Sequence, residues 1–441
     1  MRPLYFLFKV TVFYIIRVYY KHFTTNNSPK KFKAKTIFTV NHASSFMDPW
    51  VAAEVQKPIV FFMTRGDIFK GWLQPILWSA HMLPIYRRAE DGNDAHDRNQ
   101  EVFRTVFDIF DKKKSIFIFA EGYTDDVFVR SLKPVKKGAA RLAFDYYVKH
   151  NWNTDLKVQA IGINYADPNE FRAEFVVSNS NPINPLDYKE LYLENKNKAI
   201  TQFTRDIQDA MRQQIIYLKN PEWTPFFDQV FTITKKGMVY QQYDNSIPLK
   251  QRWLNMKEKA AYFNDNYNET DEKWTSLKQD LNHYFNRLKS LKLNDMLLWK
   301  SREKEKLSSF KYWLLLMLGL PFFVLGVLHN FIPYIITKRF VEKSFKRRVF
   351  WSGVKMMMGS FLDLLFNLPV VWLFYYLIYP SYWLGVLYLL TIPAITGVFA
   401  YHYYVTLKDF FNYRKIDKTT IKEIYQQRKS LENKIKSLNL S

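Results

Sequence analysis

The stretch TIFTVNHASSFMDPW, residues 36–50, changes character along its length. Its first five residues are apolar or β-branched and predict a buried strand, whereas Pro49 and the following WVAAEVQ predict the start of a helix. Between these segments lie His42 and Asp48. Positions six apart on a continuous helix do not face each other, so the two side chains meet only if the residues between them form a turn. The stretch therefore predicts a strand, a turn that carries a histidine and a carboxylate, and a helix.

Asp48 has two compatible interpretations. The proline at position 49 disfavours a helical conformation at position 48, so Asp48 is suited to cap the helix N-terminus. One carboxylate oxygen could cap while the other accepts a ring N–H from His42. Such a pair would fix the imidazole tautomer and leave the second ring nitrogen free to accept a proton near neutral pH.

The segment that surrounds this stretch alternates between β-rich and helical runs. This alternation predicts parallel strands joined by crossover helices, so we expect an α/β domain with a mostly parallel sheet over residues 34–220. The expected strands are 36–40, 58–63, 82–86, 115–120, 158–165 and 174–178, and the expected helices include 94–111 and 138–149.

The composition limits the classes of function. A net charge of +23 in 441 residues indicates an anionic partner, which could be nucleic acid, an anionic bilayer or a phosphorylated small molecule. The absence of cysteine excludes disulfides, thiolate metal sites and a thiol nucleophile. Signature motifs of serine hydrolases, Walker-type nucleotidases, dinucleotide enzymes and zincins are also absent.

Three stretches near the C-terminus are almost free of charge, namely 312–337, 356–379 and 382–404. Each reaches the roughly 20 residues that a membrane-spanning helix needs. Buried core helices are the alternative, but three such helices close together would overfill a soluble core. We therefore predict an integral membrane protein.

Basic residues flank these stretches and bear on topology. If all three crossed, some basic segments would lie on the outer face, against the preference of Lys and Arg for the cytosolic side. We expect 312–337 to form a re-entrant or interfacial hairpin that turns near Pro321 or His329–Asn330, and 356–379 and 382–404 to form a transmembrane pair. The catalytic domain would then face the cytosol, at a bacterial inner membrane or an endoplasmic-reticulum-type membrane.

The remaining segments complete the expected organisation. Residues 1–33 predict a membrane-associated helix, with an amphipathic core helix as the alternative. Residues 221–310 are expected to form a helical connector, 311–405 the membrane region, and 406–441 a basic helical tail.

Polar residues follow four of the expected strands at the point where each strand ends: His42, Arg87 and Arg88, Glu121 and Gly122, and Asn164. In an open parallel sheet, ligands bind outside the carboxyl ends of the strands. We therefore expect these groups to converge on one crevice.

These residues resemble the motifs of the glycerophospholipid acyltransferase family. NHASSFMD (41–48), LPIYRR (83–88), FAEGYTDD (119–126) and AIGINYADP (160–168) occur in the family's order. The spacing of the first motif is similar to that of the branch containing the fungal-type glycerol-3-phosphate/dihydroxyacetone-phosphate acyltransferases. The resemblance covers roughly residues 1–220, and extends more weakly to VLHNFIPYIITKRF in the membrane region.

The resemblance implies both chemistry and site residues. His42, oriented by Asp48, would deprotonate a glycerol hydroxyl that attacks an acyl thioester in one step. Arg87, Glu121 and Gly122 would bind the phosphorylated acceptor, together with Asn41 and with Arg88, which either assists or is merely solvated. The acceptor would be glycerol 3-phosphate or dihydroxyacetone phosphate, with lysophosphatidate as the alternative. The donor would be acyl-CoA or an acyl carrier protein thioester, with no cofactor and no metal.

Two features of the sequence depart from the family's motifs, and two other classes of function are alternatives to this interpretation. Ala120 occupies a position where the family usually has proline, which puts the shape of that turn in question, and residues 80–82 lack the glycine that usually opens the second motif. A catalytically inactive lipid-binding or scaffold protein is the rival of another class. A nucleic-acid partner is not expected, because the aromatic residues crowd the membrane stretches.

Overall fold

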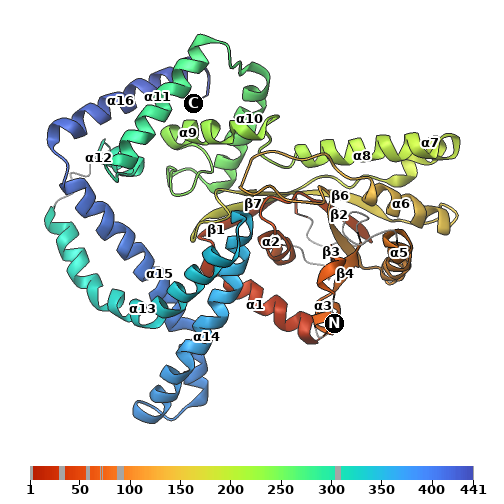
Figure 1. Cartoon of the computed structure of the whole chain (residues 1–441), viewed down its shortest axis with the longest axis horizontal. Coiled ribbons are helices and arrows are strands. Elements are labelled where there is room, and N and C mark those ends of the chain that lie inside the picture. Colours follow the sequence, from red (N-terminus) through yellow and green to blue (C-terminus); the bar gives the residue numbers. More distant parts are fainter. Residues whose placement is uncertain are drawn as a thin grey trace. The chain divides into compact units, whose positions relative to one another are not determined.

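The computed structural model describes residues 3–28, 35–55, 60–69, 71, 73–86, 94–302 and 309–440. The chain forms two compact units, Met1–Pro221 and Glu222–Ser441 (Figure 1).

A seven-stranded sheet organises the first unit, in the order β1-β7-β6-β2-β5-β3-β4. The strands are β1 (His22–Asn26), β2 (Thr36–Val40), β3 (Val60–Arg65), β4 (Met82–Ile85), β5 (Ser115–Phe119), β6 (Lys157–Tyr165) and β7 (Glu174–Asn179). From β6 to β4 all neighbours are parallel, whereas β7 runs antiparallel to β6 and β1 runs parallel to β7. The mostly parallel sheet expected from the sequence is confirmed.

The helices of this unit are α1 (Pro3–Tyr19), α2 (Met47–Val55), α3 (Leu73–Ser79), α5 (Ala95–Asp111), α6 (Gly138–Lys149), α7 (Lys189–Glu194) and α8 (Lys196–Arg212), with the short 3₁₀ turns η1 (Gly66–Ile68) and η2 (Pro185–Tyr188). α5, α6 and α8 share one core with a face of the sheet. On α5, Val102, Val106 and Phe110 recur every four residues and therefore bury one stripe of the helix against this core. The crossovers through α2, α3, α5 and α6 bring successive parallel strands back to the same end of the sheet.

β1 was not expected from the sequence. Residues 3–23 read as one apolar helix, but α1 ends at Tyr19 and the chain then extends along β7. Lys21 N–H donates to the Ala173 carbonyl at 2.8 Å, and the Asn27 side chain donates to the Asn179 carbonyl at 3.0 Å. Because β1 pairs at the edge of the sheet, its polar sequence HFTTN carries no alternating pattern that would reveal it.

The second unit is helical. Outside the apolar helices it contains α9 (Thr224–Thr234), α10 (Leu249–Asn266), α11 (Glu272–Ser290), α12 (Asp295–Arg302) and α16 (Lys418–Ser437), with η3 (Pro221–Trp223) at the start. A buried ionic group joins α9, α12 and α16: the Asp295 carboxylate lies 2.6 Å from Lys235 Nζ and 2.9 Å from Arg428 Nε.

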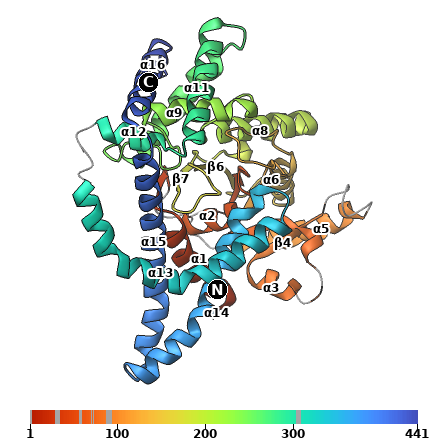
Figure 2. The ribbon, with the colours of Figure 1, turned by 60° about the vertical axis from the view of Figure 1, so that its left-hand side comes forward.

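Three helices of the second unit are long and apolar enough to span a membrane: α13 (Ser309–Ser344), α14 (Trp351–Leu377) and α15 (Tyr382–Arg414), with η4 (Arg348–Phe350) before α14. The turn expected near Pro321 or His329–Asn330 is wrong, because α13 is one helix that contains Pro321 and Pro333. Figures 1 and 2 show this helix bent along its length, as prolines inside a helix cause.

Candidate active site

The turn between β2 and α2 brings His42 and Asp48 together. β2 ends at Val40 and α2 begins at Met47. Within the turn, Met47 N–H donates to the Ser44 carbonyl at 2.9 Å, and Ser45 takes a positive φ of 42°. His42 Nδ1 then lies 2.8 Å from Asp48 Oδ2. The side-chain contact that the turn predicted is therefore present.

The Asp48 carboxylate is completely buried and has three donors. Oδ2 accepts from Ser44 N–H at 2.8 Å as well as facing the imidazole, and Oδ1 accepts from the Tyr165 hydroxyl at 2.8 Å. The interpretation of Asp48 as an N-cap is wrong, because the helix begins at Met47 and the backbone N–H that the carboxylate accepts belongs to the preceding turn. A buried carboxylate needs such donors to remain charged.

The imidazole of His42 is held on one side and open on the other. Its ring stacks on Phe119 at the end of β5, with ring centroids 4.5 Å apart, and 19% of the side chain is exposed. Nδ1 faces Asp48, whereas Nε2 makes no hydrogen bond to any described residue. With Nδ1 as the donor to the carboxylate, Nε2 carries the lone pair and can accept a proton.

Glu121 contacts the backbone of the same turn. Its buried carboxylate accepts from His42 N–H at 2.6 Å and from Lys133 N–H at 2.8 Å. Burial raises the pKa of Glu121, and the two backbone N–H groups oppose that rise. Gly122 follows with a positive φ of 79°, a conformation that glycine adopts without strain. Glu121 therefore fixes the backbone that carries His42.

The structure explains why an alanine suits position 120, where the family usually has proline. The Ala120 N–H donates to the Val40 carbonyl at 3.2 Å and extends the pairing of β5 with β2 beyond Phe119. A proline at this position could not make that bond.

Asn41 and Asn164 also bind backbone. Asn41 donates to the Ile163 carbonyl at 3.1 Å and accepts from Ile163 N–H at 2.7 Å. Asn164 accepts from Ile216 N–H at 2.8 Å and donates to the Gln214 carbonyl at 2.9 Å. Both amides thus join β6 to neighbouring segments, at the end of the sheet where His42 lies.

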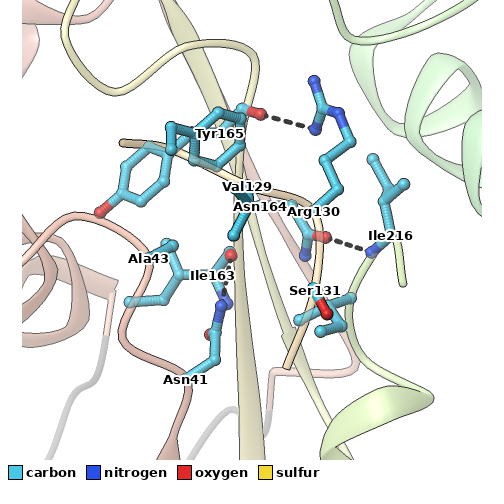
Figure 3. A pocket seen from close by; sticks show the side chains of 11 residues that line it. Asn41, Ala43, Val129, Arg130, Ser131, Ile163, Asn164, Tyr165 and Ile216 are labelled. Carbon is cyan, nitrogen blue, oxygen red and sulfur yellow. Dashed lines mark hydrogen bonds between the residues drawn. The ribbon is translucent and has the colours of Figure 1, made fainter. Parts of the chain in front are cut away.

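A small cleft opens beside these residues (Figure 3). It is lined by Asn41, Ala43, Phe128, Val129, Arg130, Ser131, Ile163, Asn164, Tyr165, Ile215 and Ile216. Arg130 is buried and donates to the Tyr165 carbonyl at 3.1 Å, which fixes the backbone at the end of β6 (Figure 3).

Two predicted site residues, Arg87 and Arg88, lie outside the described residues. Among the residues that are described, no group of three or more histidine, aspartate or glutamate side chains could hold a metal ion. The sequence reasoning did not select Tyr165, although it is the last residue of β6 and so belongs to the same row of strand ends as His42.

Residues 20–163 match the family model described as Acyltransferase. This region is therefore similar to the acyltransferase domains of that family. The matched segment contains both members of the His42–Asp48 pair and extends from before β1 into β6, so the domain coincides with most of the sheet. In the sequence, α13, α14 and α15 follow the matched segment. No curated protein matches the chain.

Proposed function

We propose that the protein is a membrane-bound acyltransferase that transfers a fatty acyl group from an acyl thioester to a hydroxyl of glycerol 3-phosphate or dihydroxyacetone phosphate. The observation that supports this most directly is the His42–Asp48 pair, whose Nε2 is not hydrogen-bonded to any residue that the structure describes, at the carboxyl end of a mostly parallel sheet within the matched segment. This is the arrangement of a general base whose orientation is fixed by a buried carboxylate.

The chemical step follows from the orientation of the imidazole. Nε2 of His42 removes the hydroxyl proton while the oxygen attacks the thioester carbonyl carbon. The carbon–sulfur bond then breaks, and the thiolate takes the proton from the imidazolium, so that the products are an ester and a free thiol. Asp48 lies 2.8 Å from Nδ1 and stabilises the imidazolium that forms between these events.

Recognition of the acceptor requires a cation near its phosphate. We assign this role to Arg87, with Arg88 beside it, because a guanidinium matches phosphate oxygens in a bidentate manner. In this proposal Glu121 and Asn41 support the site and do not contact the acceptor, since their side chains already bind the backbone of the turn and of β6.

Apolar surfaces support attachment to a bilayer. α13, α14 and α15 have the length and composition of spanning helices. In the first unit, α1 buries one side in the core and leaves Phe6, Leu7, Val10 and Phe13 about half exposed, which suits a helix lying in a membrane interface. We place the catalytic domain on the cytosolic face.

The proposal is tested with protein purified in detergent, given a labelled palmitoyl thioester and each of three acceptors: glycerol 3-phosphate, dihydroxyacetone phosphate and lysophosphatidate. Transfer to either of the first two, lost in His42→Ala, is the expected result. Transfer to lysophosphatidate alone would place the protein in the alternative class. The absence of transfer to all three, from both acyl-CoA and acyl carrier protein thioesters, would favour the inactive lipid-binding protein.

A further inference from the structure

The hydroxyl of Tyr165 contacts the site from the side opposite to His42. It donates to Asp48 Oδ1 at 2.8 Å, while Oδ2 faces His42 Nδ1 at the same distance. Tyr165 is fully buried, its hydroxyl is directed to Asp48, and Arg130 holds its carbonyl in place. The side chains of Tyr165, Asp48 and His42 therefore form one chain of hydrogen bonds, from β6 through α2 to the turn after β2.

We infer that Tyr165 is a positioning residue for the proposed reaction: its hydroxyl holds the Asp48 carboxylate against His42 and sets the pH range in which His42 accepts a proton. This inference rests on the proposed function, because it assigns a role within the same site. A donor on Oδ1 withdraws part of the negative charge that would otherwise act on the imidazole. It also prevents the carboxylate from rotating away from Nδ1.

The Tyr165 hydroxyl keeps its proton and so remains a donor to the Asp48 carboxylate. Burial raises the pKa of Tyr165 well above its ordinary value, and the negative charge of Asp48 raises it further. Among the described residues, other titratable or charged groups lie near the pair, but none of them donates a hydrogen bond to the Asp48 carboxylate. These groups are Tyr19, Tyr20, Glu121, Arg130, Lys133 and Asp167.

Tyr20 provides a matched control. It is buried beside Tyr165, with the two rings stacked at a centroid distance of 6.1 Å. Its hydroxyl has no hydrogen-bond partner among the described residues. Tyr20→Phe and Tyr165→Phe thus each remove one buried oxygen and keep the ring, but only the second removes a hydrogen bond to Asp48.

The test measures kcat and KM against pH for the parent, Tyr165→Phe and Tyr20→Phe in the full-length protein. For Tyr165→Phe we expect kcat to fall about tenfold, with both KM values unchanged. The acid limb of the kcat profile should move up by roughly half to one pH unit, because the unshielded carboxylate favours the imidazolium, which cannot accept a proton. Tyr20→Phe should leave the profile unchanged.

A second readout does not depend on activity. Diethyl pyrocarbonate modifies neutral imidazole, so its rate on the His42 peptide, followed by mass spectrometry against pH, should shift in Tyr165→Phe by the same amount as the acid limb. This shift would appear even in a protein that transfers no acyl group, which separates failure of the inference from failure of the proposed function.

Three results would overturn the inference. The first is a modification profile of His42 that is the same in Tyr165→Phe and the parent. The second is an equal shift in Tyr20→Phe, which would assign the effect to packing. The third is loss of the cooperative melting transition in Tyr165→Phe, which would mean that the hydroxyl serves the fold.

Discussion

Replacing Asp48 by asparagine separates the charge of the carboxylate from its hydrogen bonds. In the native site, Oδ2 faces His42 Nδ1 and accepts from Ser44 N–H, and Oδ1 accepts from the Tyr165 hydroxyl. An amide with its oxygen in the place of Oδ2 keeps the first two contacts. The Tyr165 hydroxyl can rotate to accept from the amide nitrogen in the place of Oδ1. Asp48→Asn therefore removes the charge and retains all three contacts.

The size of the effect follows from where that charge acts. A hydrogen bond to a charged group contributes about 1.5–3 kcal/mol, and two charges about 4 Å apart interact by about 4 kcal/mol at an effective dielectric constant of about 20. Loss of about 2–3 kcal/mol of imidazolium stabilisation corresponds to a fall in kcat of roughly 30- to 150-fold. Both KM values should stay near the parental ones, because Asp48 is completely buried.

Asp48→Ala is the matched control for the hydrogen bonds. It leaves the donors on His42, Ser44 and Tyr165 without their acceptor, at a cost of about 1–3 kcal/mol for each donor that stays buried. The melting temperature should therefore fall strongly in Asp48→Ala and little in Asp48→Asn.

The assay can follow the released thiol directly. Because the chain contains no cysteine, a thiol-reactive dye such as Ellman's reagent reports only the thiol that leaves the acyl donor. His42→Ala, which removes the base itself, should lose at least as much activity as Asp48→Asn. Parental kcat in Asp48→Asn would refute the role of the charge. A melting temperature of Asp48→Asn as low as that of Asp48→Ala would refute the exchange of hydrogen bonds.

Three further predictions concern other parts of the chain. Arg87→Lys should raise the KM for the phosphorylated acceptor far more than the KM for the thioester, because an ammonium cannot reproduce a bidentate contact; equal changes would indicate a supporting role. Burial lowers the pKa of the Lys235 ammonium from its ordinary value of 10.5 to about 8, although the Asp295 carboxylate opposes this. Between about pH 8 and pH 10.5 the folded state therefore binds fewer protons than the unfolded state. Thermal stability of the second unit, followed by circular dichroism, should therefore rise between these pH values, and a similar rise in Lys235→Met would contradict this origin. Basic residues on both sides of α13 favour a helix that lies in the membrane interface without crossing. Single cysteines at Phe345 and Ser430 should then resist a membrane-impermeant thiol reagent in intact cells while one at Ser381 reacts, and the opposite pattern would indicate three crossings with the catalytic domain in the cytosol.

The sequence predicted the parts of the site that depend on local pattern. The strand at 36–40, the turn and the helix after it are encoded within one stretch, so the approach of His42 to Asp48 could be inferred from it. The remaining partners of this pair come from distant segments. Tyr165 lies 117 residues from Asp48, and Glu121 lies 79 residues from His42. Their contacts depend on strand order, which places β6 and β5 on either side of β2.

The same reason explains why α13 continues where the sequence indicated a turn. Pro333 has no N–H to donate to the His329 carbonyl, so one backbone acceptor in this apolar helix loses its ordinary donor. In the structure, Asn367 Nδ2 on α14 lies 3.4 Å from that carbonyl, and the two side chains also pair through His329 Nδ1 and Asn367 Oδ1. His329 Nε2 lies 2.9 Å from the Tyr388 hydroxyl on α15. The histidine that is unfavourable in an isolated span is therefore satisfied within the bundle, because irregular or polar positions at membrane depth are tolerated where protein groups surround them. These partners lie 38 and 59 residues away along the chain, and no local pattern around His329 could indicate them.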